Sequence, residues 1–353
     1  MYSYVIITNN SSYNSGSIYS PTNSLTVREL TSGTSYTFYI NPYNSIGLQG
    51  IQRSLDVTTV PINTTITIVN DTDATSNIRN NIVSNETPSV TYKKVVSFTA
   101  GTSTFTVDNR VTAKILIVGG GGGGGGAYNS VEGGGGGGGG SVGIGTIELI
   151  PTITYTVTIA NSCNPSEYNN LVTGNNTSIS WTNVSSYTET ANGGGSGGVG
   201  RNNSSMSKGG NGGSGGGGCG NNYTTSPNYG PKGSVSQLDS TTGLITYYGN
   251  EGGDGYHLKG GGGGGGAGSS GTSTTSSSNN TGGTGGSGKT WIIDNTTYGV
   301  GGNGGNAQTN NVSDYTGSAD PNRGLGGNGI AGKYGENRRG QGGGSGILIL
   351  AFN

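Results

Sequence analysis

The sequence predicts a mostly β protein with essentially no α-helix, in which short β-strands precede a bundle of polyglycine II helices bracketed by further strands. Glycine accounts for 77 of the 353 residues, and only 28% of the residues are hydrophobic. Globular domains average only about 7% glycine. Apolar segments stand directly before the first glycine run and directly after the last. One conventional hydrophobic core of this length is therefore excluded.

Residues 1–60 are predicted to form short β-strands. The first is the β-branched run YVII at 4–7, which is followed by a polar turn stretch. A second apolar and aromatic segment, LTSGTSYTFYI, occupies 30–40 and ends near Asn44 and Gly47. This alternation of strand and turn signals indicates a small β-sheet unit at the start of the chain.

The second segment resembles the second half of a fibronectin type III domain. In that family a Leu, a Gly-Thr turn and a Tyr mark the corner into one strand, and an Asn and a Gly close the next hairpin. The resemblance implies a β-sandwich in which Tyr36 hydrogen-bonds back across the corner. A complete sandwich needs about 100 residues, so we interpret 1–60 as a partial domain from the C-terminal part of a longer chain. The matching positions are Leu30, Gly33, Tyr36, Phe38, Ile40, Asn44 and Gly47.

Residues 61–94 are predicted to connect two domains and to contain one strand, at 64–69. Beyond them, segments with a period of two or with β-branched runs predict the strands of a second domain, 95–353. The strand at 114–118 runs straight into glycine, and the strand at 346–352 leaves glycine at the other end. Strands are expected at 96–99, 104–107, 114–118, 144–150, 153–159 and 346–352.

Three structures compete for the glycine-rich middle. Flexible linkers are common for Gly/Ser tracts, because glycine loses the most entropy on ordering. A collagen triple helix needs glycine at every third residue with abundant proline, and the chain has only 9 prolines. Polyglycine II helices keep their N–H and C=O groups free to bond to neighbouring helices, so a packed array satisfies its backbone laterally.

The spacing of the glycine runs favours the polyglycine II bundle. About nine segments have similar lengths, which linkers do not need, and each would make a rod of about 20–35 Å. Such a bundle has almost no hydrophobic core and depends on many hydrogen bonds of about 0.5–1.5 kcal/mol each. The segments are 119–126, 133–140, 193–200, 209–220, 260–268, 282–288, 299–305, 326–332 and 340–346.

The order of these features resembles the glycine-rich domains of phage tail-fibre adhesins and of surface proteins of large algal and protist viruses. The resemblance is carried by the strand and glycines of 115–126, by YTVTI at 155–159 and by GGSGILI at 343–349. The family's Pro-Gly-Gln turn before Tyr-Thr-Val is replaced by IPTIT at 150–154. The resemblance implies a virion-surface or extracellular protein whose rods carry turn loops that contact a host receptor.

Four segments between the rods are rich in side chains and are candidates for contact with a partner: 161–192, 221–250, 269–281 and 306–324. Aromatic rings among Asn, Asp and Ser supply apolar area and adaptable hydrogen bonds, which carbohydrate or protein recognition uses. The same rings can also pack on rod ends and shield them from water. The candidate binding residues are Tyr168, Trp181, Tyr187, Tyr223, Tyr229, Tyr247, Tyr248, Asp314, Tyr315 and Asp320.

No pattern of catalytic or metal-binding residues appears, so we expect no enzyme, no cofactor and no metal. The single histidine, His257, has no nucleophile pattern nearby. The Gly-Lys-Thr at 288–290 precedes the strand-like WII at 291–293, whereas a phosphate-binding loop opens a helix. Cys163 and Cys219 lack metal-site spacing and can either form one disulfide or remain two separate thiols.

The charge balance gives no reason to expect nucleic acid as a partner. The formal net charge is −1, and the 16 Lys and Arg residues are scattered. No run of about 18 apolar residues is present, so no membrane insertion is expected. Three functions stay open: an adhesin, fibre or spike that binds a host receptor or surface glycan, a capsid-associated or filament-forming protein whose loops bind other subunits, and a secreted lectin-like module. The sequence also leaves open whether the protein is a homo-oligomer.

Overall fold

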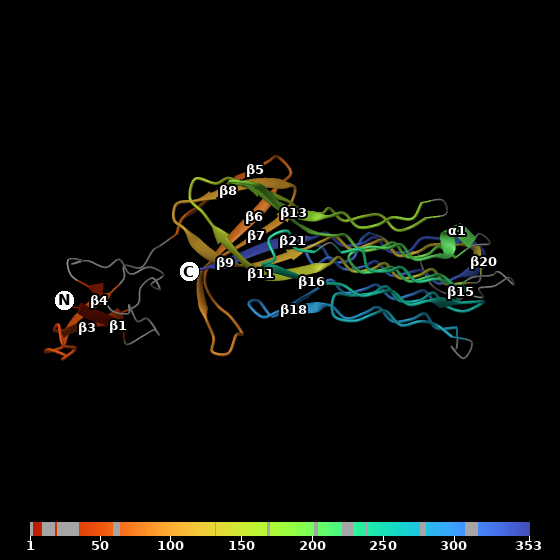
Figure 1. The fold of residues 1–353 in the computed structure, drawn as a ribbon. Helices are drawn as coiled ribbons and strands as arrows, with labels where there is room; N and C mark the ends of the chain where they lie inside the picture. The colour runs from red at the N-terminus through yellow and green to blue at the C-terminus, as the bar shows by residue number, and fades with distance from the viewer. Residues whose placement is uncertain are drawn as a thin grey trace. The chain divides into compact units, whose positions relative to one another are not determined.

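In the computed structural model, the protein is described over residues 3–8, 18–19, 35–58, 64–130, 132–167, 170–200, 204–220, 229–237, 239–275, 280–307 and 317–353. The chain divides into two compact units, Met1–Thr64 and Thr65–Asn353. Their secondary structure is almost entirely β, which confirms the predicted fold class (Figure 1). Within the described ranges, the helical structure is one turn of α-helix, α1, at Ser204–Ser207.

The first unit contains one antiparallel sheet with the strand order β2-β1-β3-β4. The side chains of Tyr36 and Phe38 are buried on one face of β3. Asn44 and Gly47 lie in the β3–β4 turn, where the Asn44 Oδ1 accepts hydrogen bonds from two backbone N–H groups and Gly47 has a φ of 82°. The strands are β1 Ser3–Thr8, β2 Ile18–Tyr19, β3 Ser35–Tyr43 and β4 Arg53–Thr58.

The second unit begins with two sheets that pack face to face. The larger sheet has the order β16-β11-β9-β21-β7-β6 and the smaller one β14-β13-β12-β8-β5, and all of their strand pairs are antiparallel. The larger sheet is made of β6 Thr75–Val83, β7 Thr91–Ala100, β9 Val111–Val118, β11 Val142–Leu149, β16 Ile245–Tyr248 and β21 Ile347–Phe352. The smaller sheet is made of β5 Ile66–Asn70, β8 Thr102–Val107, β12 Tyr155–Thr158, β13 Thr177–Thr182 and β14 Ser186–Ala191.

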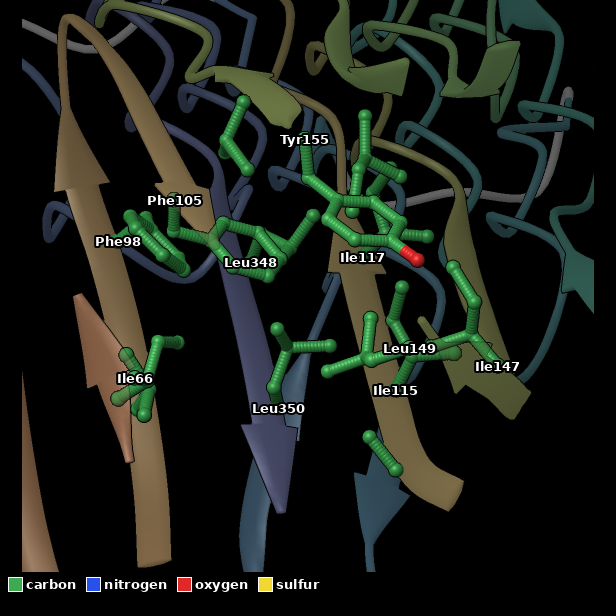
Figure 2. Close-up of a cluster of buried hydrophobic side chains, with 14 of the residues drawn as sticks. Ile66, Phe98, Phe105, Ile115, Ile117, Ile147, Leu149, Tyr155, Leu348 and Leu350 are labelled. Carbon is green, nitrogen blue, oxygen red and sulfur yellow. The ribbon is translucent and has the colours of Figure 1, made fainter. Parts of the chain in front are cut away.

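A hydrophobic core fills the space between these sheets (Figure 2). The rings of Phe98, Phe105 and Tyr155 stack in sequence, with centroid separations of 5.6 and 4.9 Å. Leu348 and Leu350 of the last strand lie in the same core. Because β21 pairs with β9 on one side and β7 on the other, the end of the chain lies beside the strand that enters the first glycine run.

The second face of the larger sheet is also covered. The hairpin of β18 (Lys289–Trp291) and β19 (Thr296–Tyr298) packs Trp291 and Tyr298 into a second core. Burial on both faces explains why β21 and the end of β9 read as continuous apolar runs without alternation.

The segment 61–94 does more than connect two domains. Strand β5 forms one edge of the smaller sheet, and β6 forms one edge of the larger sheet. The sequence of β6, TSNIRNNIV, is mostly polar, and most of its residues are exposed. An edge strand that is solvated on both faces shows no period-two pattern, which is why the sequence did not predict it.

From the sheets the chain continues as extended glycine rods, whose hydrogen bonds repeat every three residues. All eight N–H groups of 119–126 donate to other segments, over 2.8–3.1 Å. The N–H of Gly119 donates to the segment 135–141, that of Gly120 to 166–175 and that of Gly121 to 341–344. The next N–H groups along the run donate to the same three segments in the same order. This lateral, threefold pattern is compatible with the predicted polyglycine II geometry.

The run 133–141 shows that the array is hexagonal, because it has six neighbours. Each of its N–H groups donates to one of three neighbouring segments, and three further segments donate to its carbonyl groups. The acceptor segments are 192–198, 259–265 and 324–330, and the donor segments are 119–125, 214–220 and 302–305. A rod with six neighbours has no direction left for a side chain.

Several segments predicted as loops contain rods or strands. The outer rods 161–166 and 170–176 carry hydrogen bonds to 119–126, although 174 is the only glycine in them. Residues 231–236 and 269–274 are hydrogen-bonded rods of the same kind. Elsewhere, 161–192 contains β13 and β14, and 221–250 contains β16 and a two-residue strand at Tyr229–Gly230.

Candidate functional site

The flanks of the bundle carry side chains at every third position of the outer rods. In the rod 281–288 the exposed residues are Thr281, Thr284 and Ser287, while Gly283 and Gly286 between them are buried. A threefold rod turns one residue in three toward the same side. In this rod the side chains therefore stand at the positions that face solvent.

Many of these outer side chains accept hydrogen bonds from the N–H groups that the neighbouring rod turns outward. The Asn303 Oδ1 accepts from the Gly285 N–H at 2.8 Å, and the Asn328 Oδ1 accepts from the Asn303 N–H at 2.8 Å. The hydroxyls of Thr272 and Ser269 do the same for Thr284 and Ser287. The Asn, Ser and Thr bias of the chain thus has a structural cause, because these side chains satisfy the edge of the hydrogen-bonded array.

The end of the bundle far from the sheets carries a different set of elements (Figure 1). We call it the distal tip and define it by α1 and by two short antiparallel strand pairs. The pairs are β10 (Ala127–Ser130) with β20 (Lys333–Arg338), and β15 (Tyr229–Gly230) with β17 (Gly255–Tyr256).

The distal tip carries exposed apolar and charged side chains. Tyr334 is 76% exposed and Leu258 is 39% exposed. Glu336 bonds to Lys333 and, at 3.0 Å, to Arg338. The hydrogen bond from Lys333, followed by that from Arg338, holds the pKa of Glu336 below its usual value. The side chains around Tyr334 are therefore held in place by charge pairs and can form an ordered contact surface.

Of the candidate residues, Trp181 and Tyr187 are brought together. They face each other across β13 and β14, and their rings stack with centroids 5.5 Å apart. The ring centroids of Trp181 and Tyr155 lie 5.8 Å apart. Trp181 and Tyr187 therefore extend the aromatic row of the core to the edge of the sheet. Both are half-buried and border a hollow lined mainly by threonine and serine. The packing role that the sequence left open for Trp181 is therefore present beside a partly accessible surface.

Tyr247 and Tyr248 pack within the second unit. Tyr247 donates to the Glu189 carboxylate at 3.0 Å, and burial and that carboxylate raise the pKa of its phenol. Lys289 lies 4.1 Å from the centre of the Tyr248 ring. Glu189 is only 1% exposed, and its carboxylate also accepts hydrogen bonds from Ser240, Thr241 and Thr242. The cluster joins strand β14 to the 240–242 turn and to β16.

The other candidates do not join one site. Asp320 lies on the bundle flank, with its carboxylate 3.8 Å from Arg323 and 76% exposed. Tyr229 starts β15 at the distal tip. Tyr168, Tyr223, Asp314 and Tyr315 fall outside the described residues. Cys163 and Cys219 are both buried and are not bonded to each other, so the disulfide that the sequence left open is not formed.

The described residues hold no cluster of three or more His, Cys, Asp and Glu side chains that could bind a metal ion. In the same part of the chain, no helix has the length and apolarity needed to cross a membrane.

A family model described as a glycine-rich domain matches residues 97–353, which cover both sheets except β5, β6 and the start of β7, together with the whole bundle. No curated protein matches the chain.

Proposed function

The chain belongs to the glycine-rich domain family over residues 97–353, and we propose that it is a non-enzymatic attachment protein of a virion or other extracellular surface. In this proposal the bundle is a stiff support, and the side chains of the distal tip bind a host receptor or surface glycan. The proposal rests on the location of exposed side chains that do not cap the backbone of a neighbouring rod.

Recognition needs side chains, because a glycine rod presents only backbone, which is the same in every protein. Inside the bundle the backbone groups are bonded to one another. On the flanks many polar side chains are used as hydrogen-bond caps, for example Asn303 and Thr272. One end of the bundle continues into the sheets. At the opposite end, the distal tip presents Tyr334 and Leu258 as exposed apolar side chains.

A second candidate function, assembly with other subunits, is favoured by the first unit. Four large apolar side chains of the β3–β4 hairpin are exposed by 78, 62, 80 and 56%. They are Ile46, Leu48, Ile51 and Leu55. Exposed apolar groups that gather on one element mark protein contact surfaces. Attachment through the tip and anchoring through the first unit are compatible roles for one fibre or spike protein.

The attachment proposal is tested with a tip variant, Tyr334→Ser combined with Leu258→Asn. Leu258 has a φ of 55°, a conformation that asparagine tolerates, so the variant should fold. Thr284→Val on the flank is the matched control, because it changes an exposed side chain away from the tip. Labelled full-length protein is incubated with a panel of cell types, and retention is measured. We expect the tip variant to lose retention and the control to keep it. Equal retention of both variants would rule out recognition at the tip.

A further inference from the structure

A groove lies on the flank of the bundle, away from the distal tip. It has a volume of about 320 Å³ and runs across the rods that contain Gly285, Asn303, Asn328 and Gln341. The glycines of these rods form part of its lining, and Val300 and Leu325 add half-exposed apolar surface. Its volume is at the lower end of the range for small-ligand sites.

The amide side chains of the groove are held in one orientation. The Asn303 Oδ1 accepts from the Gly285 N–H, and the Gln341 Oε1 accepts from the Asn328 side-chain amide at 2.8 Å and its backbone N–H at 3.3 Å. Because each amide oxygen is bonded to the rod, each NH₂ group is directed elsewhere. Within the described ranges these two NH₂ groups have no protein acceptor.

An acceptor faces the same groove. The Asp320 carboxylate is 76% exposed and has only a 3.8 Å contact with Arg323. The groove thus combines two oriented hydrogen-bond donors, one acceptor and the apolar side chains of Val300 and Leu325. Along each rod, equivalent side chains recur every three residues, or about 9 Å, so the arrangement suits an extended ligand that alternates polar and apolar groups.

We propose that this groove binds a neutral, unbranched oligosaccharide. Sugar hydroxyls can both accept from the amide NH₂ groups and donate to the Asp320 carboxylate, while C–H faces pack on Val300 and Leu325. A neutral ligand fits because the carboxylate would repel an anionic one. This site is separate from the distal tip, so it does not depend on attachment there.

The test uses two variants that keep the backbone caps but change the outward group. Asn303→Asp and Gln341→Glu retain an oxygen for the Gly285 N–H and the Asn328 amide, and replace the NH₂ donor by an acceptor. Asn306→Asp is the matched control. Asn306 lies three residues beyond Asn303 on the same rod and outside the groove lining. Its Oδ1 accepts a hydrogen bond from the Gly282 N–H of the neighbouring rod.

Full-length protein is titrated by NMR with neutral tetrasaccharides of glucose, galactose, mannose and N-acetylglucosamine, and with a Gly/Ser peptide of similar length. We expect one saccharide to bind wild type and Asn306→Asp equally, and to bind each groove variant about tenfold more weakly because a donor is lost. Circular dichroism melting of all four proteins verifies folding. Binding of no saccharide, binding of the peptide alone, or equal affinity in all variants would overturn the proposal.

Discussion

Adding a single methyl group inside the bundle should strongly destabilise the protein. An ideal Cβ on Gly122 would lie 2.1 Å from the Gly195 carbonyl oxygen and 2.7 Å from that of Gly194. Real Cβ atoms essentially never come closer than 3.0 Å to a heavy atom. Gly122→Ala must therefore push the 193–200 rod aside by about 1 Å.

That displacement strains the hydrogen bonds that hold the two rods together. The 193–200 rod donates to the Gly120 and Gly123 carbonyl groups, both at 2.8 Å, and its Gly195 carbonyl accepts from Gly138 on a third rod, also at 2.8 Å. Losing two to three such bonds, at about 0.5–1.5 kcal/mol each, costs about 1–4.5 kcal/mol. In a site without clashes, Gly→Ala raises the free energy of unfolding by about 0.4–1 kcal/mol. The sign of the measured change therefore tells a densely packed rod from one with room for a Cβ atom.

Thermal melting followed by circular dichroism measures the effect. For a unit of this size, about 1 kcal/mol corresponds to about 2–4 °C, so Gly122→Ala should melt several degrees below wild type. Thr281→Val, which keeps a β-branched residue on the exposed side of a rod, is the control and should stay within about one degree. Equal midpoints for Gly122→Ala and the control would refute dense packing of the rods. Ser273→Val is an unsuitable control, because the Ser273 Oγ caps the Asp254 N–H at 2.9 Å.

Two further predictions concern buried groups. Burial raises the pKa of Glu189, but hydrogen bonds from Thr242, Ser240 and Tyr247 outweigh it, and the folded pKa lies below the usual 4.5. The stability contributed by this carboxylate is therefore complete above pH 4.5 and is lost as the pH falls through the folded pKa. Glu189→Gln should lower the melting midpoint at pH 7 and weaken its decrease in acid, and a pH series with unchanged slope would contradict this. Cys163 and Cys219 are buried and not joined by a disulfide, and burial raises the pKa of the Cys163 thiol. Iodoacetamide at pH 8 should therefore leave native protein unlabelled and add two labels in urea without reductant. Mass spectrometry that finds no label in urea would indicate a disulfide.

The candidate contact residues show where sequence reasoning stops. Trp181 and Tyr187 were chosen for their chemistry, and the register of β13 with β14 makes them neighbours. Tyr247 has similar sequence surroundings, but it lies on an edge strand whose inner face meets Glu189. A sequence shows that an aromatic ring is available, but the strand pairing decides whether the ring faces a partner or the interior.

The outer rods were missed for a related reason. Segments such as 170–176 and 231–236 look like ordinary polar loops, because a rod at the boundary needs small residues only where it faces a neighbour. A signal was present in the more regular cases. In 281–288 and 299–306 a larger residue recurs at every third position, which is the period of the rod. These interruptions mark the exposed side of outer rods.

The sequence by itself determined the elements whose cause is local. Uninterrupted glycine and β-branched runs specify rods and core strands, because only those residues suit a crowded array or a strand buried on both faces. The tertiary structure alone decided which rods lie at the centre, which third of each outer rod meets solvent, and which Asn, Ser and Thr side chains cap a neighbour. Those properties depend on the six directions around each rod, and segments distant in sequence, such as 133–141 and 324–330, occupy these directions.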